Sequence, residues 1–196
     1  MGRAQDRKPV AIVRVKICGI TSLRDAWSAL DAGADALGFI FHSASPRKVS
    51  PGEARSIIRT LPPLCASFGV FAGEEPRVML DLARACGFGF CQVHAGRTGG
   101  DVLKLLSISG QNLNYLSTSP LPSPLPPLPL RVPLVPAVQV RGPADLRRAD
   151  RLGTSLLHLD SRDPARVAHS GGTLNWTMIG KAKLSTPFLL AGGLTS

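Results

Sequence analysis

The chain has 196 residues, of which 44% are hydrophobic and 18% charged, a composition that excludes a disordered chain and a membrane-embedded one. The formal net charge is +10, yet the basic residues are scattered, and one Tyr and two Trp offer little for base stacking. The densest cluster, Arg147, Arg148 and Arg151, is expected on the solvated face of one helix. We therefore expect no nucleic-acid partner.

No apolar run approaches the roughly 20 residues that cross a bilayer, and no apolar signal segment follows Met1. The sequence thus predicts a cytoplasmic protein with no membrane partner. The four cysteines include no CxxC pair and no His at zinc-finger spacing, so no metal site is predicted. In a reducing compartment, Cys65, Cys86 and Cys91 are expected to be free thiols that pack as small hydrophobic side chains.

Short β-branched runs alternate with helical spacing along the chain, which indicates a parallel α/β sheet. Helix starts are marked by Ser22 with Asp25 three residues later, and by Ser50 with Glu53 and Pro51 between them. A helix at 143–152 follows the fifth strand. The seven predicted strands are residues 13–18, 36–41, 67–71, 90–94, 136–140, 155–159 and 188–190.

Between a short predicted helix at 101–106 and the fifth strand the alternation stops. Eight of the 17 prolines lie from Pro120 to Pro136, and proline can neither donate to a strand ladder nor sit inside a helix. This pattern predicts an extended, polyproline-like surface insertion at about 117–136. A ligand for an SH3-type partner is the alternative interpretation, although such matches arise freely in this composition. Residues 1–196 are otherwise predicted to form one domain.

Seven strand–helix beginnings favour a TIM-type (β/α) barrel over a doubly wound sheet. The pattern provides no eighth strand and no last helix before Ser196, so an incomplete barrel is expected. In such barrels the reacting groups follow the carboxyl ends of the strands.

A thiol, Cys18, and a carboxylate, Asp160, stand at two of these strand ends and could form a proton-transfer pair. Arg47 suits a substrate carboxylate or phosphate, because its guanidinium group presents a fork of donors. Paired glycines expose backbone N–H groups that can hold phosphate. These features indicate a barrel that acts on an anionic metabolite. The remaining candidates are Gln92, His94, Gly171, Gly172, Gly192 and Gly193.

Several motifs in order extend this interpretation, and together they resemble the phosphoribosylanthranilate isomerase family. The resemblance runs from Val15 to Leu194 and omits the proline-rich insertion. The motifs are Lys16–Thr21, Gly33–Phe41, Ser45–Arg47 with Val49–Ser50, Gly69–Phe71, Gln92–His94, Leu157–Ser161, Gly171–Thr173 with Trp176, and Leu190–Leu194.

The resemblance implies an Amadori rearrangement in tryptophan biosynthesis, without cofactor or metal, on a phosphorylated small molecule. Asp160 would be the general acid that opens the ribose ring, and Cys18 the general base that takes the C2 proton. Arg47 would bind the anthranilate carboxylate, Gln92 and His94 would line the site, and the glycine pairs would bind phosphate. His42, His158 and His169 are expected to be structural or exposed.

Two departures from the family pattern leave alternatives open. Gly171–Thr173 runs directly into Leu174, and the eighth strand with its phosphate-binding turn is missing from the pattern. Half of the phosphate cradle would then be lost, which predicts weak activity and association through an unpaired edge. The alternatives are an inactive truncated barrel that serves as a binding module, and a related barrel isomerase or synthase acting on another phosphorylated metabolite.

Overall fold

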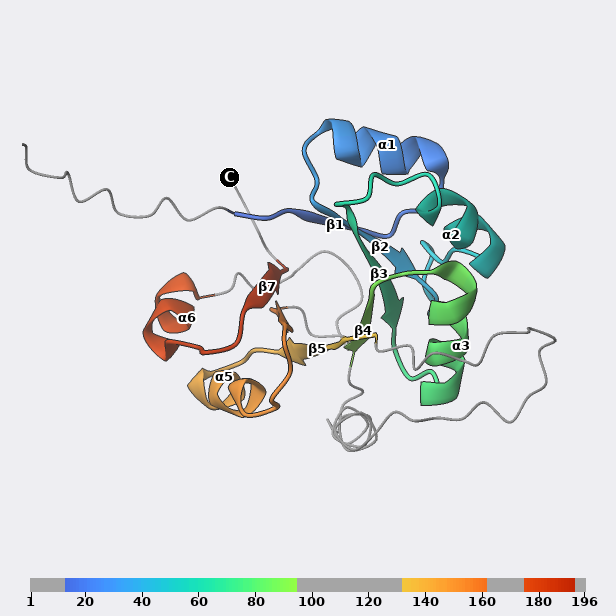
Figure 1. Ribbon diagram of the computed structural model, residues 1–196. Coiled ribbons are helices and arrows are strands. Elements are labelled where there is room, and N and C mark those ends of the chain that lie inside the picture. The colour runs from blue at the N-terminus through green and yellow to red at the C-terminus, as the bar shows by residue number, and fades with distance from the viewer. Residues whose placement is uncertain (1–12, 95–131, 162–174, 193–196) are drawn as a thin grey trace, which may run out of the picture.

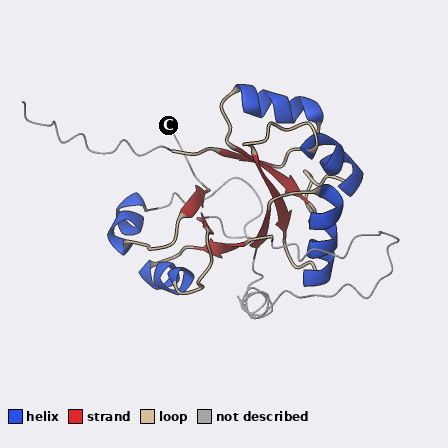
Figure 2. Ribbon diagram, in the orientation of Figure 1, coloured by secondary structure: helices blue, strands red, loops and turns tan. Residues whose placement is uncertain are grey.

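Seven parallel strands form one curled sheet in the order β1-β2-β3-β4-β5-β6-β7, with the helices on its outer side (Figures 1 and 2). The computed structural model describes residues 13–94, 132–161 and 175–192. This is the TIM-type barrel architecture that the sequence predicts, curled part of the way round; within the described residues β1 and β7 are the two sheet edges. The elements are β1 (Lys16–Cys18), α1 (Leu23–Asp31), β2 (Ala36–Ile40), α2 (Pro51–Ile58), β3 (Ala66–Phe71), α3 (Pro76–Cys86), β4 (Phe90–His94), β5 (Leu134–Gln139), α5 (Pro143–Asp150), β6 (Leu157–Asp160), α6 (Trp176–Ala182) and β7 (Phe188–Ala191).

The predicted helix starts are confirmed in atomic detail. Ser22 caps α1 by accepting the Asp25 backbone N–H at 3.1 Å. At α2 the capping is reciprocal, because Ser50 Oγ accepts the Glu53 N–H at 3.2 Å while Glu53 Oε2 accepts the Ser50 N–H at 3.1 Å. Such caps satisfy backbone donors that a helix N-terminus leaves unpaired. They fix where each helix leaves the loop after a strand, and hence the shape of the barrel mouth.

Hydrophobic packing divides into three clusters among the described residues. The largest lies between β2–β4 and helices α1–α3, and it includes several aromatic rings, of which Phe41 stacks on Phe71 at 5.4 Å between centroids. A smaller cluster packs β5–β7 against α5 and α6 around Leu146 and Leu157. The third cluster, with Phe68 and Val135, combines residues from β2, β3 and β5 on the other side of the sheet and fills the barrel interior.

The boundaries of β1 and β5 differ from the prediction. β1 begins at Lys16 rather than at residue 13, and Val13 is 80% exposed. β5 begins at Leu134, inside the predicted insertion, and Pro136 is fully buried within it. The proline is tolerated because it pairs with Val93 of β4 whereas the ladder to β6 begins one residue later, at Ala137.

The predicted insertion is therefore too long at its C-terminal end, since Val132 and Val135 belong to hydrophobic clusters. The rest of the insertion and the predicted helix at 101–106 lie outside the described residues. Smaller shifts affect four other strands: β2 ends at Ile40, β3 begins at Ala66, β6 spans Leu157–Asp160, and β7 ends at Ala191.

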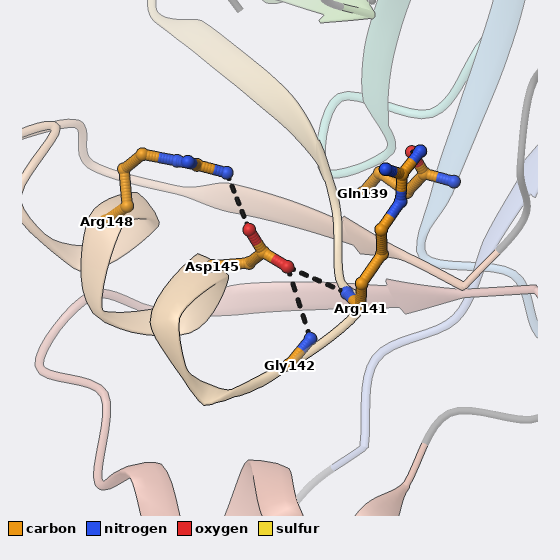
Figure 3. Close-up of polar contacts among 5 residues, drawn as sticks. All are labelled: Gln139, Arg141, Gly142, Asp145 and Arg148. Atoms are coloured by element: carbon orange, nitrogen blue, oxygen red, sulfur yellow. Dashed lines mark hydrogen bonds and ion pairs between the residues drawn. The ribbon is translucent and has the colours of Figure 1, made fainter.

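The surface of α5 carries the densest basic cluster as predicted. Arg147, Arg148 and Arg151 are exposed, and Arg148 Nη2 pairs with Asp145 Oδ1 at 2.6 Å (Figure 3). Asp145 also accepts the backbone N–H groups of Arg141 and Gly142 at 2.9 and 3.2 Å, so it serves as an anchor for the start of the helix. Among the described helices, none is long and apolar enough to cross a membrane.

Candidate active site

The alternation of β1 places Lys16 and Cys18 on the barrel interior, because residues two apart in a strand share a face. Ile17, between them, points to the outer side and is 41% exposed. Cys18 is half-buried and pairs with Gly38 of β2. The chain then turns at Gly19, whose φ of 90° is one that glycine adopts without strain. The thiol thus stands at the end of a strand, on the face where barrel chemistry takes place.

Gly38 makes room for the Lys16 and Cys18 side chains of β1. A Cβ atom at this position would lie 2.8 Å from Cys18 Sγ and 3.0 Å from Lys16 Nζ. Both contacts are closer than real Cβ atoms normally tolerate, so any larger residue would displace the thiol or the ammonium group. The Gly38 carbonyl also accepts the N–H groups of Gly19 and Ile20 at 2.9 and 3.0 Å, which holds the turn after Cys18 in place.

Arg47 reaches back from the loop after β2 to the end of β1. Its Nη1 donates to the Cys18 carbonyl oxygen at 2.8 Å, and the side chain covers Gly19, where a Cβ atom would meet Nη1 at 2.8 Å. The guanidinium group remains exposed, with other donors free to face a ligand. The structure therefore places Arg47 beside Cys18.

Gln92 and His94 of β4 continue the polar group across the barrel interior. Lys16 Nζ donates to Gln92 Oε1 at 2.9 Å, and Gln92 Nε2 lies 2.9 Å from His94 Nε2. Gln92 is only 1% exposed, so its amide is fixed by these partners. The His94 ring meets the His158 ring of β6 edge to face, with centroids 5.6 Å apart. A chain of contacts thus leads from β1 through β4 to β6.

Asp160 is the last residue of β6 and shares the interior face with His158. It is 7% exposed, and its backbone is held on both sides, by the Val140 N–H to its carbonyl at 2.9 Å and by pairing with Ala191. Gly192 follows β7 with a φ of 87°, a position for backbone donors near the same end of the sheet. Gly171, Gly172 and Gly193 lie outside the described residues.

Two residues of this polar group are missing from the sequence-based site. Lys16 opens the Lys16–Thr21 motif, and its i, i+2 spacing to Cys18 places it on the same face of the strand. His158 was expected to be structural or exposed; it is buried and stands two residues before Asp160. Strand alternation is the signal for both, whereas their contacts with β4 depend on pairing that spacing alone does not reveal.

Burial sets the chemistry of the other three cysteines. Burial raises the pKa of the Cys91 thiol to about 12 and also raises that of Cys86, so both stay protonated. Burial likewise raises the pKa of Cys65, with the charge of Asp35 adding to the effect. Their interpretation as small packed side chains fits these environments. Within the described part of the chain, no group of three or more His, Cys, Asp or Glu residues could hold a metal ion.

A parallel α/β barrel with a thiol, an arginine and a carboxylate at its strand ends places this chain among the (β/α) barrel proteins, whose reacting groups lie at that end of the sheet. The family model for N-(5'-phosphoribosyl)anthranilate isomerase matches residues 15–109. A relative of that name from Pelobacter propionicus is 36% identical over 94% of this chain and 77% of its own length. The chain belongs to the N-(5'-phosphoribosyl)anthranilate isomerase family.

Solved structures agree with this assignment. Phosphoribosylanthranilate isomerase from Thermotoga maritima superimposes with a TM-score of 0.72 at 33% identity, covering 93% of this chain and 78% of that one. A second structure of such an isomerase, in complex with reduced 1-(o-carboxyphenylamino)-1-deoxyribulose 5-phosphate, gives a TM-score of 0.68 at 31% identity, covering 93% of this chain and 77% of that one. The described barrel is therefore the fold of these enzymes.

Proposed function

We propose that this chain isomerises N-(5'-phosphoribosyl)anthranilate to the corresponding 1-deoxyribulose phosphate aminoketose, a step of tryptophan biosynthesis. Family membership supports the reaction, and the position of Cys18 between Lys16, Gly38 and Arg47 is the observation that supports the site. The named relatives include an isomerase solved with a compound that carries both an aromatic carboxylate and a sugar phosphate.

The chemistry assigns one proton transfer to each side of the barrel. Asp160 gives its proton to the ribose ring oxygen, the C1–O bond breaks, and the anthranilate nitrogen takes up the positive charge as a protonated Schiff base. The Cys18 thiolate then removes the C2 proton, and the electron pair of that bond forms the C1–C2 double bond of an enolamine. Tautomerisation of the enolamine gives the aminoketose. Two positioned acid–base groups of this kind typically contribute about 10²–10⁴-fold each.

Binding is divided between the two ends of the substrate. The exposed guanidinium of Arg47, fixed at its other edge by the Cys18 carbonyl, would take the anthranilate carboxylate next to the general base. Gln92 and His94 would line the ring-opened sugar. Backbone donors of Gly192, with Gly171, Gly172 and Gly193 outside the described residues, would take the phosphate.

Complementation of a tryptophan auxotroph that lacks this isomerase tests the proposal, with Cys18→Ala as the matched inactive control. The purified chain is then assayed on phosphoribosylanthranilate for turnover. We expect growth and turnover that are lost in the control. A folded chain that shows neither would overturn the proposal and favour the alternative of a barrel that only binds.

A further inference from the structure

Lys16 is an unusual residue for a barrel interior, because lysine is rarely buried without a partner. Three groups surround its ammonium. Gln92 Oε1 accepts a hydrogen bond at 2.9 Å, the Phe68 ring has its centroid 5.1 Å from Nζ, and Cys18 Sγ borders the same space beside Gly38. An amide oxygen and an aromatic face each favour a cation over a neutral amine, and the thiolate form of Cys18 would do the same.

The ammonium and the thiol occupy one small space. A single point, the Cβ position that Gly38 leaves empty, lies 2.8 Å from Cys18 Sγ and 3.0 Å from Lys16 Nζ. Gln92 restrains the lysine from the opposite strand, and is itself held by His94. Burial lowers the pKa of Lys16, while the neighbouring Cys18 opposes that shift. The Lys16 and Cys18 side chains are therefore electrostatic neighbours.

Other charged groups near the thiol act differently. Arg47 is the second cation beside Cys18, but its Nη1 is engaged with the backbone carbonyl. β2 contributes Gly38 and β3 contributes Phe68, neither of which titrates. Among the described residues, the other titratable groups on this interior face are His94 on β4 and His158 and Asp160 on β6. Of the cations that the structure describes, Lys16 is thus the one whose charged atom shares the space beside Gly38 with the thiol.

We propose that Lys16 is a positioning residue for Cys18: its ammonium, held by Gln92, stabilises the thiolate and aims it into the barrel. A thiolate, rather than a thiol, is the species that can take a proton, and a nearby cation is what favours it. The inference rests on the proposed function, since the thiolate matters for turnover only if Cys18 is the general base.

The test measures the rate of Cys18 alkylation by iodoacetamide as a function of pH, read by mass spectrometry of the Cys18 peptide. Cys65 serves as an internal reference thiol, because burial raises its pKa. Lys16→Met removes the charge at similar length, and Lys16→Arg keeps it. Lys181→Met, on the exposed surface of α6, is the matched control for loss of one lysine.

At neutral pH we expect Cys18 alkylation to slow by roughly tenfold or more in Lys16→Met, with the profile moved to higher pH. Lys16→Arg should restore most of the rate, and Lys181→Met should behave as the parent. On phosphoribosylanthranilate, Lys16→Met should lower kcat far more than it raises KM. A folded Lys16→Met protein with the parent alkylation profile would show a merely structural lysine and overturn the inference.

If Lys16→Met does not fold, the alkylation rate of the unsubstituted protein tests the inference instead. Its Cys18 should react at neutral pH much faster than the same thiol in a synthetic peptide of residues 13–24, and equal profiles overturn the inference. The proposed function fails in a different way. A folded protein whose Cys18 is alkylated readily, yet which does not turn over phosphoribosylanthranilate, would retain the Lys16–Cys18 pair and lose the isomerase assignment.

Discussion

The two halves of the sheet are packed to different extents. In the first half, residues 13–94, three helices cover four strands, and the outer cluster contains sixteen buried residues, fifteen of them from this half. In the second half, residues 132–161 and 175–192, the described helices α5 and α6 cover three strands over six buried residues. The family model matches residues 15–109, which is mainly the first half.

The proposed reaction needs both halves. The thiol, the arginine and the lysine lie on β1 and the loop after β2, whereas the carboxylate lies on β6. The β4–β5 ladder and the edge-to-face contact of His94 with His158 join the halves. The proposed base thus stands on β1, an edge strand of the well-packed half, and the proposed acid stands on β6, which packs in the smaller cluster.

The largest effect is expected from removing either proton-transfer group. Cys18→Ala and Asp160→Asn should each lower kcat by about 10²–10⁴-fold, because positioned acids and bases contribute that much. Both variants should keep the far-UV spectrum and the melting behaviour of the parent. Steady-state assays on phosphoribosylanthranilate measure the loss. Parent-like turnover in either variant would remove that residue from the mechanism, and would place the chemistry in one half alone.

The next largest effect is expected from truncating a buried side chain in each of the two outer hydrophobic clusters. Phe71→Ala removes a fully buried ring that stacks on Phe41, and should lower the free energy of unfolding by about 3–5 kcal/mol. Leu146→Ala acts on the smaller cluster, whose surroundings can collapse more easily, and should cost about 2–3 kcal/mol, the lower part of the usual range. Urea unfolding followed by fluorescence gives both values. A greater loss for Leu146→Ala would contradict the difference in packing between the halves.

A smaller effect, visible on acidification, comes from carboxylates that fasten loops in each half. Backbone N–H groups of Thr186 and Ser185 hold the pKa of Asp150 at about 2, below its ordinary 3.8. The folded-state pKa is depressed, so this stabilisation is complete above about pH 4 and is lost as the pH falls towards 2. In the first half, the Val15 N–H and Arg14 lower the pKa of Asp35 in the same direction.

Asp150→Asn should therefore lower the melting temperature by a few degrees at pH 7 and flatten its decline between about pH 4 and 2. Asp31→Asn, an exposed carboxylate of α1, is the charge-matched control. Thermal melts over this pH range measure the effect. If the melting temperature of Asp150→Asn fell with pH as steeply as that of the parent, the hydrogen bonds from Ser185 and Thr186 to Asp150 would not stabilise the second half.

Local rules predicted the first half better than the second for a physical reason. The capping box at Ser50 and Glu53 depends on two residues three positions apart, so the local sequence reveals it. The buried strand β2 can be recognised from its own hydrophobic composition. The start of β5 depends on register: Pro136 is acceptable only because its pairing with β6 begins at Ala137. The same holds for the candidate site. Arg47 contacts Cys18, and Gln92 contacts His94. Lys16 was not a candidate, because its hydrogen-bond partner Gln92 lies 76 positions away in the sequence.

The smallest effect is expected from shortening the connection between the halves. Deleting residues 117–130 shortens the stretch between β4 and β5 by less than half, and loop closure changes by only about 0.6 kcal/mol per twofold change in length. Stability should then stay within about that amount. Extending the deletion to Leu134 removes Val132, which is buried in the larger cluster, and the first residue of β5, so a clear loss should follow. Urea unfolding of the two variants side by side measures the contrast. Equal losses would mean that the proline-rich segment itself supports the junction of the halves, and equal retention would mean that Val132 does not secure β5 against the first half.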